Sequence, residues 1–175
     1  MTTEELAEKI RAASLLEGEF TLRSGKKSSF YVDKYLFETQ PAILSEVGQR
    51  LASRRSSGTT VIAGAELGGV ALAAAASMSC GLPFVIIRNS KKDYGTGKMH
   101  EGRLAAGDVV LLVEDIATTG GQVLEAATVI KEAGAAVEKI VAVVDRGQGA
   151  AENIRAAGFV FESILDSKAL RLPTA

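Results

Sequence analysis

The stretch VVLLVEDIATTGGQ (residues 109–122) decides the fold class of this chain. Its first five residues are apolar without interruption, which is typical of a strand covered on both faces in a parallel sheet. Two acids follow, Glu114 and Asp115, and then small residues that open a helix over 121–134. The stretch therefore predicts a buried strand, a turn and a helix, the unit from which α/β folds are built.

The turn in this stretch suits a ligand that carries a sugar beside a phosphate. Backbone N–H groups ahead of a helix bind phosphate, and the hydroxyls of Thr118 and Thr119 add donors. Since carboxylates repel phosphate, we expect Glu114 and Asp115 to accept hydrogen bonds from sugar hydroxyls or to approach a metal. A helix N-cap is the alternative for the two acids alone. The whole string is neither a Walker A loop nor a G-x-G-x-x-G motif.

On both sides of this stretch, apolar runs alternate with helical patterns. Strands are predicted over 60–63, 83–88, 109–113 and 139–144, with an edge strand over 159–165. Helices are predicted over 3–16, 41–55, 69–80, 121–134 and 148–157, and a hairpin over 20–33. This order predicts an α/β fold with a central, mostly parallel sheet flanked by helices.

Each predicted strand end is followed by charged or glycine-rich residues, and ligands in open parallel sheets bind beyond these ends. A glycine-rich turn over 64–69 follows the first strand, and Asp145-Arg146 follows the last. Arg88 opens the basic stretch 89–107, which shows no period. A connection of this length inside a compact domain is usually a lid or a binding loop. A solvated surface loop is the alternative.

Length and composition limit the classes of protein that this chain can represent. Its 175 residues suit one domain, and 47% hydrophobic with 23% charged residues excludes disorder. One cysteine and one histidine exclude a disulfide framework and a histidine-cluster metal centre. A net charge of −1 argues against nucleic-acid binding. Because neither a signal peptide nor a membrane span is evident, we expect a cytoplasmic protein.

Several segments together resemble one family. Residues 109–122 resemble the signature with which type I phosphoribosyltransferases bind phosphoribosyl diphosphate (PRPP). Residues 20–33 (FTLRSGKKSSFYVD) resemble the N-terminal signature of orotate phosphoribosyltransferases, and residues 88–97 (RNSKKDYGTG) resemble their catalytic loop. Asp145-Arg146 resembles their late substrate-binding pair. The resemblance covers about residues 18–147 in order.

This resemblance implies a single phosphoribosyltransferase domain over 1–175, with the type I phosphoribosyltransferase fold. It also implies a small N-terminal hood (1–36) and a mobile catalytic loop (89–107). The family's glycosyltransferases move the 5-phosphoribosyl group from PRPP to N1 of orotate in pyrimidine and UMP biosynthesis. Mg²⁺ is required and is carried by PRPP, without a direct side-chain ligand. A homodimer is implied, in which the loop acts across the interface.

The resemblance also assigns roles to individual residues. Glu114 and Asp115 would hold the ribose hydroxyls, and with Lys92 they are the expected catalytic residues. The expected 5′-phosphate contacts are Ile116, Ala117, Thr118, Thr119, Gly120 and Gly121. The diphosphate would meet the turn over 65–69 and the side chains of Arg88, Lys91, Lys92, Lys98 and His100. The expected orotate contacts are Lys26, Phe30, Tyr31, Thr118 and Arg146. Core packing is the alternative at Phe30 and Tyr31, and a surface ion pair is the alternative at Arg146.

Two other functions remain open at this point. One is a phosphoribosyltransferase for another base, such as a purine. Arg146 disfavours it, because a guanidinium is a natural bidentate partner for the carboxylate of orotate, which purines lack. The other is a non-catalytic regulator that senses PRPP. Such proteins often carry a DNA-binding unit or a basic face, and the sequence indicates neither.

Overall fold

The structure, a computed structural model, describes residues 1–21, 25, 27–90 and 98–172. Its centre is a six-stranded sheet in the order β5-β4-β3-β6-β7-β8. The five parallel strands are β3 (Val61–Ala65), β4 (Phe84–Ile87), β6 (Val109–Ala117), β7 (Ala136–Asp145) and β8 (Phe161–Asp166). The short β5 (His100–Glu101) runs antiparallel to β4. The predicted α/β fold with a mostly parallel sheet is confirmed.

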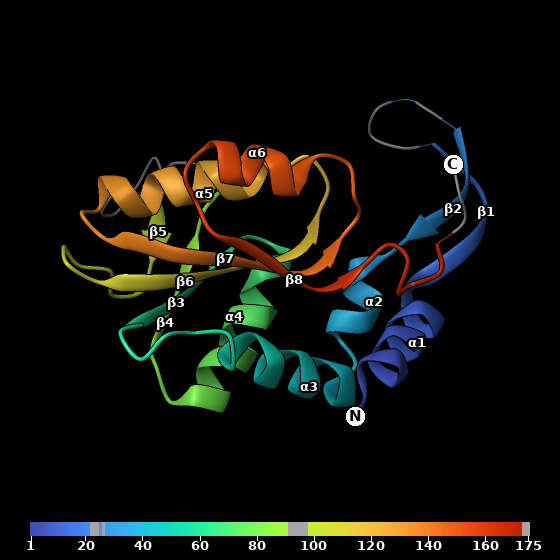
Figure 1. The fold of residues 1–175 in the computed structure, drawn as a ribbon, viewed down its shortest axis with the longest axis horizontal. Coiled ribbons are helices and arrows are strands. Elements are labelled where there is room, and N and C mark those ends of the chain that lie inside the picture. Colours follow the sequence, from blue (N-terminus) through green and yellow to red (C-terminus); the bar gives the residue numbers. More distant parts are fainter. Residues whose placement is uncertain (22–24, 26, 91–97, 173–175) are drawn as a thin grey trace.

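Helices cover both faces of this sheet (Figure 1). The helices α3 (Pro41–Ala52) and α4 (Gly68–Cys80) lie on one face, and α5 (Gly121–Glu132) and α6 (Ala150–Ala156) lie on the other. Residues of β6 alternate between the two layers: Leu111 and Val113 pack with α3 and α4, whereas Leu112 packs with α5 and α6. Burial on both faces explains the uninterrupted apolar run in this strand.

The connection from β3 to α4 is unusually tight. A Cβ atom at Gly64 would lie 2.0 Å from the carbonyl oxygen of Gly69, so no side chain fits at this position. Glycine lets the backbone of the helix approach the strand directly. The intervening turn is thereby held at the carboxyl edge of the sheet.

The N-terminal segment packs at one end of the sheet (Figure 1), where Leu6, Ile10 and Phe37 share a buried core with β6 and β7. The helix α1 (Thr3–Ser14) begins with a capping box between Thr2 and Glu5. The strands β1 (Leu15–Thr21) and β2 (Lys27–Val32) form an antiparallel hairpin, and the short helix α2 (Lys34–Glu38) follows. Figure 1 shows the hairpin extending beyond α1 and α2 at one end of the molecule.

Several local predictions differ from the structure. The helix predicted over 3–16 ends at Ser14, because β1 begins at Leu15, ahead of the hairpin predicted over 20–33. The strand β6 continues beyond the predicted 109–113 as far as Ala117, because residues 114–117 keep pairing with β7. The stretch 89–107, predicted to lack regular structure, contains β5, which pairs with β4. The helix α2 was not predicted, since five residues are too few to show a helical period.

Within the described ranges, no helix combines the length and the apolar character that a bilayer span requires.

Candidate active site

The carboxyl ends of the parallel strands meet at one edge, as predicted. The amide of Glu66, just after β3, donates a hydrogen bond to the carbonyl of Ile87 at the end of β4 (2.8 Å). The amide of Arg146, just after β7, donates to the carbonyl of Ala117 at the end of β6 (3.0 Å). The first bond joins the segment after β3 to the end of β4, and the second joins the segment after β7 to the end of β6.

A hollow of about 200 Å³ lies at this edge, where β6 passes into α5. It is lined by Glu114 and by residues 116–123. The turn is braced from α6, because the side-chain amide of Asn153 donates to the carbonyl of Thr119 (2.9 Å). The hollow combines a carboxyl group with the N-terminus of α5, which attracts negative charge. It therefore offers the two halves of a site for a phosphorylated sugar.

The two acids lie inside the strand β6 and not in a turn after it. Glu114 is 7% exposed and Asp115 is 2% exposed, so both carboxyls are buried. Asp115 is held from two sides: the ammonium of Lys34 lies 2.6 Å from its Oδ2, and the amide of Ile116 donates to its Oδ1. The N-cap alternative for the pair is excluded, since α5 begins only at Gly121.

A third buried carboxyl, Glu38 at the end of α2, belongs to the same cluster. Burial, reinforced by the charge of Asp115, raises the pKa of Glu38 to about 8. The same two causes, in the same order, raise the pKa of Glu114 to about 8. Within the described part of the chain, Oε1 of Glu38 and Oε2 of Glu114 are buried without a hydrogen-bond partner. Both groups are therefore protonated near neutral pH, and the ammonium of Lys34 is the charged partner of Asp115.

Three polar side chains connect the segments after β3, β4 and β6. The backbone amide of Asn89 donates to Oε1 of Glu66 (2.7 Å), and its side-chain amide donates to the Glu66 carbonyl (2.9 Å). Gln122, in the first turn of α5, donates both to that carbonyl (3.0 Å) and to the side-chain oxygen of Asn89 (3.2 Å). The turn after β3 is thus fixed to its two neighbours.

The basic stretch leaves β4 at this edge and returns to it at Met99. Arg88 donates through its backbone amide to the carbonyl of Met99 (2.9 Å) and through Nε to the carbonyl of Ser90 (3.2 Å). Lys98 is exposed, and His100 lies in β5. Burial and the charge of Lys98 lower the pKa of His100, so its imidazole is neutral at pH 7. The predicted site residues Lys26, Lys91 and Lys92 lie outside the described residues.

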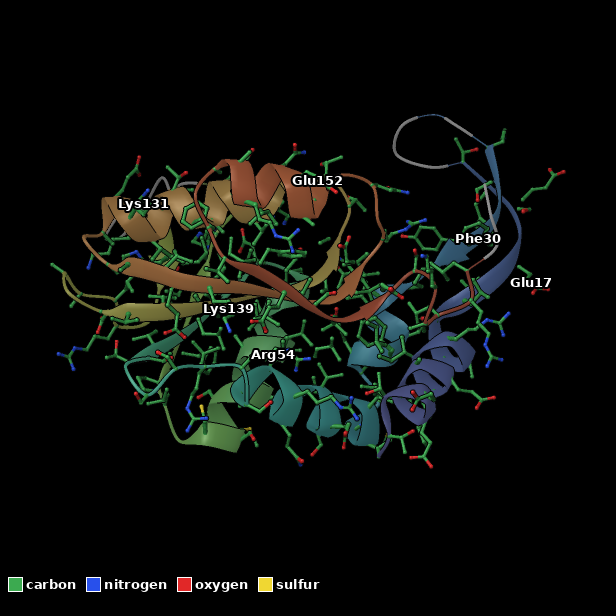
Figure 2. All side chains as sticks on the ribbon, in the orientation of Figure 1. Glu17, Phe30, Arg54, Lys131, Lys139 and Glu152 are labelled. Carbon is green, nitrogen blue, oxygen red and sulfur yellow. The ribbon has the colours of Figure 1, made fainter. Side chains whose placement is uncertain are left out.

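The predicted orotate contacts fall on two parts of the fold. Arg146 lies beside the phosphate turn through its bond to Ala117. Phe30 and Tyr31 lie on β2 in the separate hairpin (Figure 2), where Phe30 is buried and Tyr31 packs against Phe20 with ring centroids 5.7 Å apart. The structure thus brings Arg88, Glu114, Asp115, Arg146 and the turn to one edge.

Four residues of the site (Lys34, Glu38, Asn89 and Gln122) received no role of their own from sequence, and Glu66 was expected only as part of the turn over 65–69. Lys34 directly follows the stretch that carries the N-terminal resemblance, and Glu38 stands four residues later. The i, i+4 spacing of a lysine and a glutamate suggests only a surface pair on a helix. Glu66, Asn89 and Gln122 are ordinary polar residues whose partners are far apart in the sequence. No local pattern identifies any of these contacts.

Comparison with known proteins identifies relatives of this chain in sequence and in structure. The phosphoribosyl transferase domain model matches residues 37–170. The orotate phosphoribosyltransferase of Methanocella arvoryzae is 44% identical over 167 residues, covering 95% of each chain. A crystal structure of the orotate phosphoribosyltransferase of Mycobacterium tuberculosis, in complex with Fe(III) dicitrate, superposes with a TM-score of 0.87 at 32% identity, covering 97% of this chain and 99% of the other. The same enzyme in complex with PRPP gives a TM-score of 0.80 at 31% identity, with 97% and 99% coverage.

Proposed function

The chain belongs to the phosphoribosyltransferase family, among relatives that are orotate phosphoribosyltransferases, and on this basis we propose that it transfers the 5-phosphoribosyl group of PRPP to N1 of orotate. The products are orotidine 5′-monophosphate and diphosphate, so the reaction is a step of pyrimidine and UMP biosynthesis. One observation carries the proposal: Glu114 and the turn over 116–123 line a single hollow. This arrangement accepts a ribose and its 5′-phosphate side by side.

PRPP would bind with its ribose against β6 and its phosphate against the turn. The ribose hydroxyls donate hydrogen bonds to Glu114 and Asp115. The 5′-phosphate lies against residues 116–121 and accepts from the backbone amides of residues 118–121 and from the hydroxyls of Thr118 and Thr119. The buried position of both acids supports this role, because hydrogen bonds strengthen as water is excluded, and a protonated Glu114 still accepts through its carbonyl oxygen.

The diphosphate would leave toward the turn after β3 and the basic stretch. As the bond from C1′ to the diphosphate oxygen breaks and the bond to N1 forms, negative charge grows on the leaving group. The cations at Arg88, Lys91, Lys92 and Lys98 stabilise this charge more in the transition state than in the ground state. A neutral His100 would donate a hydrogen bond to the same group. The position of Arg88 next to the turn containing Glu66 supports this direction.

Orotate would lie between the sheet edge and the hairpin. The guanidinium of Arg146 pairs with the carboxylate of orotate in a bidentate manner, and its place beside the phosphate turn supports this role. Lys26, Phe30, Tyr31 and Thr118 stay our proposed contacts to the pyrimidine ring. The 44% exposure of Tyr31 leaves its ring available to a ligand.

The donor chemistry of the site fits Mg²⁺ that arrives with its substrate. This ion usually keeps several waters and binds one or two carboxylates together with substrate phosphates. Here the ion is carried by the phosphates of PRPP and by water, without a direct side-chain ligand. When bound, Mg²⁺ would supply positive charge that neutralises the diphosphate. In the described ranges, no group of three or more acidic, histidine or cysteine side chains forms a site for a metal by itself.

We also assign a second copy of the chain to the groove between α3 and α4. This groove has a volume of about 500 Å³ and is lined largely by apolar residues, among them Leu44, Ala71, Ala74 and Ala75. Met78 at its edge is 85% exposed, and Leu67 at the start of α4 is 67% exposed. Apolar side chains this exposed favour a protein interface. In a homodimer, loop 89–107 would act on the partner's site. We also propose that the protein is cytoplasmic.

A direct assay separates this function from its alternatives. The protein is mixed with PRPP, Mg²⁺ and either orotate or adenine, and the loss of orotate absorbance and the formation of nucleotide are followed. The proposal predicts turnover with orotate alone. Turnover with adenine alone would identify a purine enzyme, and tight PRPP binding without turnover would identify a regulator.

A further inference from the structure

Resting on the function proposed above, we propose that Lys34 is a positioning residue of the ribose site, which fixes Asp115 from the N-terminal segment and keeps its carboxylate ready for a sugar hydroxyl. Lys34 belongs to α2, outside the sheet that carries the acid pair. Its Nζ lies 2.6 Å from Oδ2 of Asp115, a short distance for a charge-assisted hydrogen bond. The contact joins residues 81 positions apart.

The surroundings leave Asp115 little choice of conformation. A Cβ atom built at Gly68 would lie 1.6 Å from Oδ2 of Asp115 and 3.2 Å from Nζ of Lys34. The carboxylate and its lysine therefore fill the space that any side chain at position 68 would occupy. Oδ1 is held by the amide of Ile116. Oδ2 is held at this point by Lys34.

Lys34 also supplies positive charge to a cluster of carboxyl groups. Three carboxyls gather here, from Glu38, Glu114 and Asp115, and Asp33 adds a further negative charge near Glu38. Lys34 is the cation that acts on both Glu38 and Glu114. Although burial lowers the pKa of Lys34, the charge and hydrogen bond of Asp115 outweigh it and raise this pKa. The lysine thus stays charged beside Asp115.

This arrangement differs from a purely structural ion pair, because the lysine is only partly enclosed. The Lys34 side chain is 28% exposed while that of Asp115 is 3% exposed, so the lysine is the member of the pair that reaches solvent. The ring of Tyr35 lies 5.4 Å from the same Nζ and limits where the ammonium can move. The carboxyl group of Asp115 is thus oriented by Lys34 and the amide of Ile116 before a ligand binds.

Lys34→Gln and Lys34→Arg test this role, with the exposed α1 residue Lys9 changed to Gln as the matched control. We expect Lys34→Gln to raise the KM for PRPP about tenfold, the loss typical of a weakened charge-assisted hydrogen bond, with the KM for orotate unchanged. The kcat at saturating PRPP and orotate should change far less, because the lysine positions a binding group and does not touch the reacting bond. Lys34→Arg should restore the KM for PRPP, and Lys9→Gln should match the wild type.

An unchanged KM for PRPP in Lys34→Gln, or an Arg variant as impaired as the Gln variant, would overturn the proposal. If Lys34→Gln folds poorly, the double variant Lys34→Gln/Asp115→Asn removes the uncompensated buried charge and is compared with Asp115→Asn alone. A positioning role predicts no further loss of PRPP affinity in the double variant, and a further loss contradicts it. Calorimetric titration with PRPP and Mg²⁺ gives these affinities even if orotate is not turned over, so failure of the proposed reaction remains a separate result.

Discussion

The backbone amide of Asn89 donates a hydrogen bond to Oε1 of Glu66 over 2.7 Å, and the side-chain amide of the same residue donates to the Glu66 carbonyl over 2.9 Å. Two contacts between the same residues lock the turn after β3 to the first residue of the basic stretch. Gln122 joins them from α5. The proposed diphosphate turn is thereby set in place before substrate arrives, which lowers the ordering cost of binding.

Asn89→Ala should weaken PRPP binding while leaving the affinity for orotate in place. The substitution removes the side-chain bonds to Glu66 and Gln122 but keeps the backbone bond, so we expect a rise in the KM for PRPP of about three- to tenfold. Initial rates at varied PRPP and saturating orotate measure it. Gln122→Ala should act in the same direction, and a larger effect on orotate than on PRPP in either variant would contradict this role.

Gly68→Ala should disturb the acid pair directly. The added methyl group would overlap Oδ2 of Asp115, so the carboxylate must turn away from Lys34. We expect an at least tenfold loss of PRPP affinity, which calorimetric titration would detect. Gly58→Ala is the matched control, because a Cβ atom there meets only Ser56 Oγ at 3.7 Å. Equal PRPP affinity in the two variants would show that Asp115 does not depend on this space.

Arg146→Ala should weaken the binding of orotate. Removing the guanidinium leaves the carboxylate of orotate without its bidentate partner, so the KM for orotate should rise by about a hundredfold and that for PRPP by far less. Steady-state kinetics with each substrate varied in turn separate the two constants. Arg11→Ala, on the exposed face of α1, serves as the control. A larger effect on PRPP would remove Arg146 from the orotate site.

Lys92→Ala should impair the chemical step more than binding. A cation that acts on the leaving diphosphate contributes mainly in the transition state, so kcat should fall by about a thousandfold or more while the dissociation constant of PRPP changes little. Single-turnover rates and PRPP titration provide the two numbers. Equal losses in rate and affinity would instead indicate a residue that binds both states alike.

Glu38→Gln should change how stability depends on pH. In the folded protein the pKa of Glu38 is raised from 4.5 to about 8, so the folded state keeps a proton that the unfolded chain releases. The free energy of unfolding therefore falls as the pH rises from about 4.5 to 8. The Gln variant lacks this contribution, and its Tm at pH 9 should exceed that of the wild type by about 2–5 °C.

Thermal unfolding between pH 5 and pH 9 measures this difference. Near pH 5 the two proteins should unfold at nearly the same temperature, and Glu114 should retain part of the pH dependence in both. A constant Tm difference across the whole range would show that Glu38 does not carry a proton in the folded state.

The part of the site that one segment contains was predictable from sequence. Residues 109–122 combine an apolar strand, two acids and a small-residue turn, and each of these patterns has a local physical cause. The fold class followed from the same patterns repeated along the chain. Even here the end of β6 was placed too early, because acids at a strand end resemble the start of a turn until their pairing with β7 is known.

The contacts that connect distant segments were not predictable. Lys34 meets Asp115 only because α2 is folded against the sheet, and Asn89 meets Glu66 only because β3 and β4 are neighbours. Such pairs leave no period or composition in the sequence. The raised pKa of Glu38 has the same origin, since burial by other elements causes it.

A crystal structure of the protein with PRPP and Mg²⁺ tests the central claim most directly. The ribose hydroxyls should lie within hydrogen-bond distance of Glu114 and Asp115, and the 5′-phosphate should lie against the amides of residues 118–121. PRPP bound at another part of the molecule, with both acids still turned to Lys34 and the interior, would contradict the account.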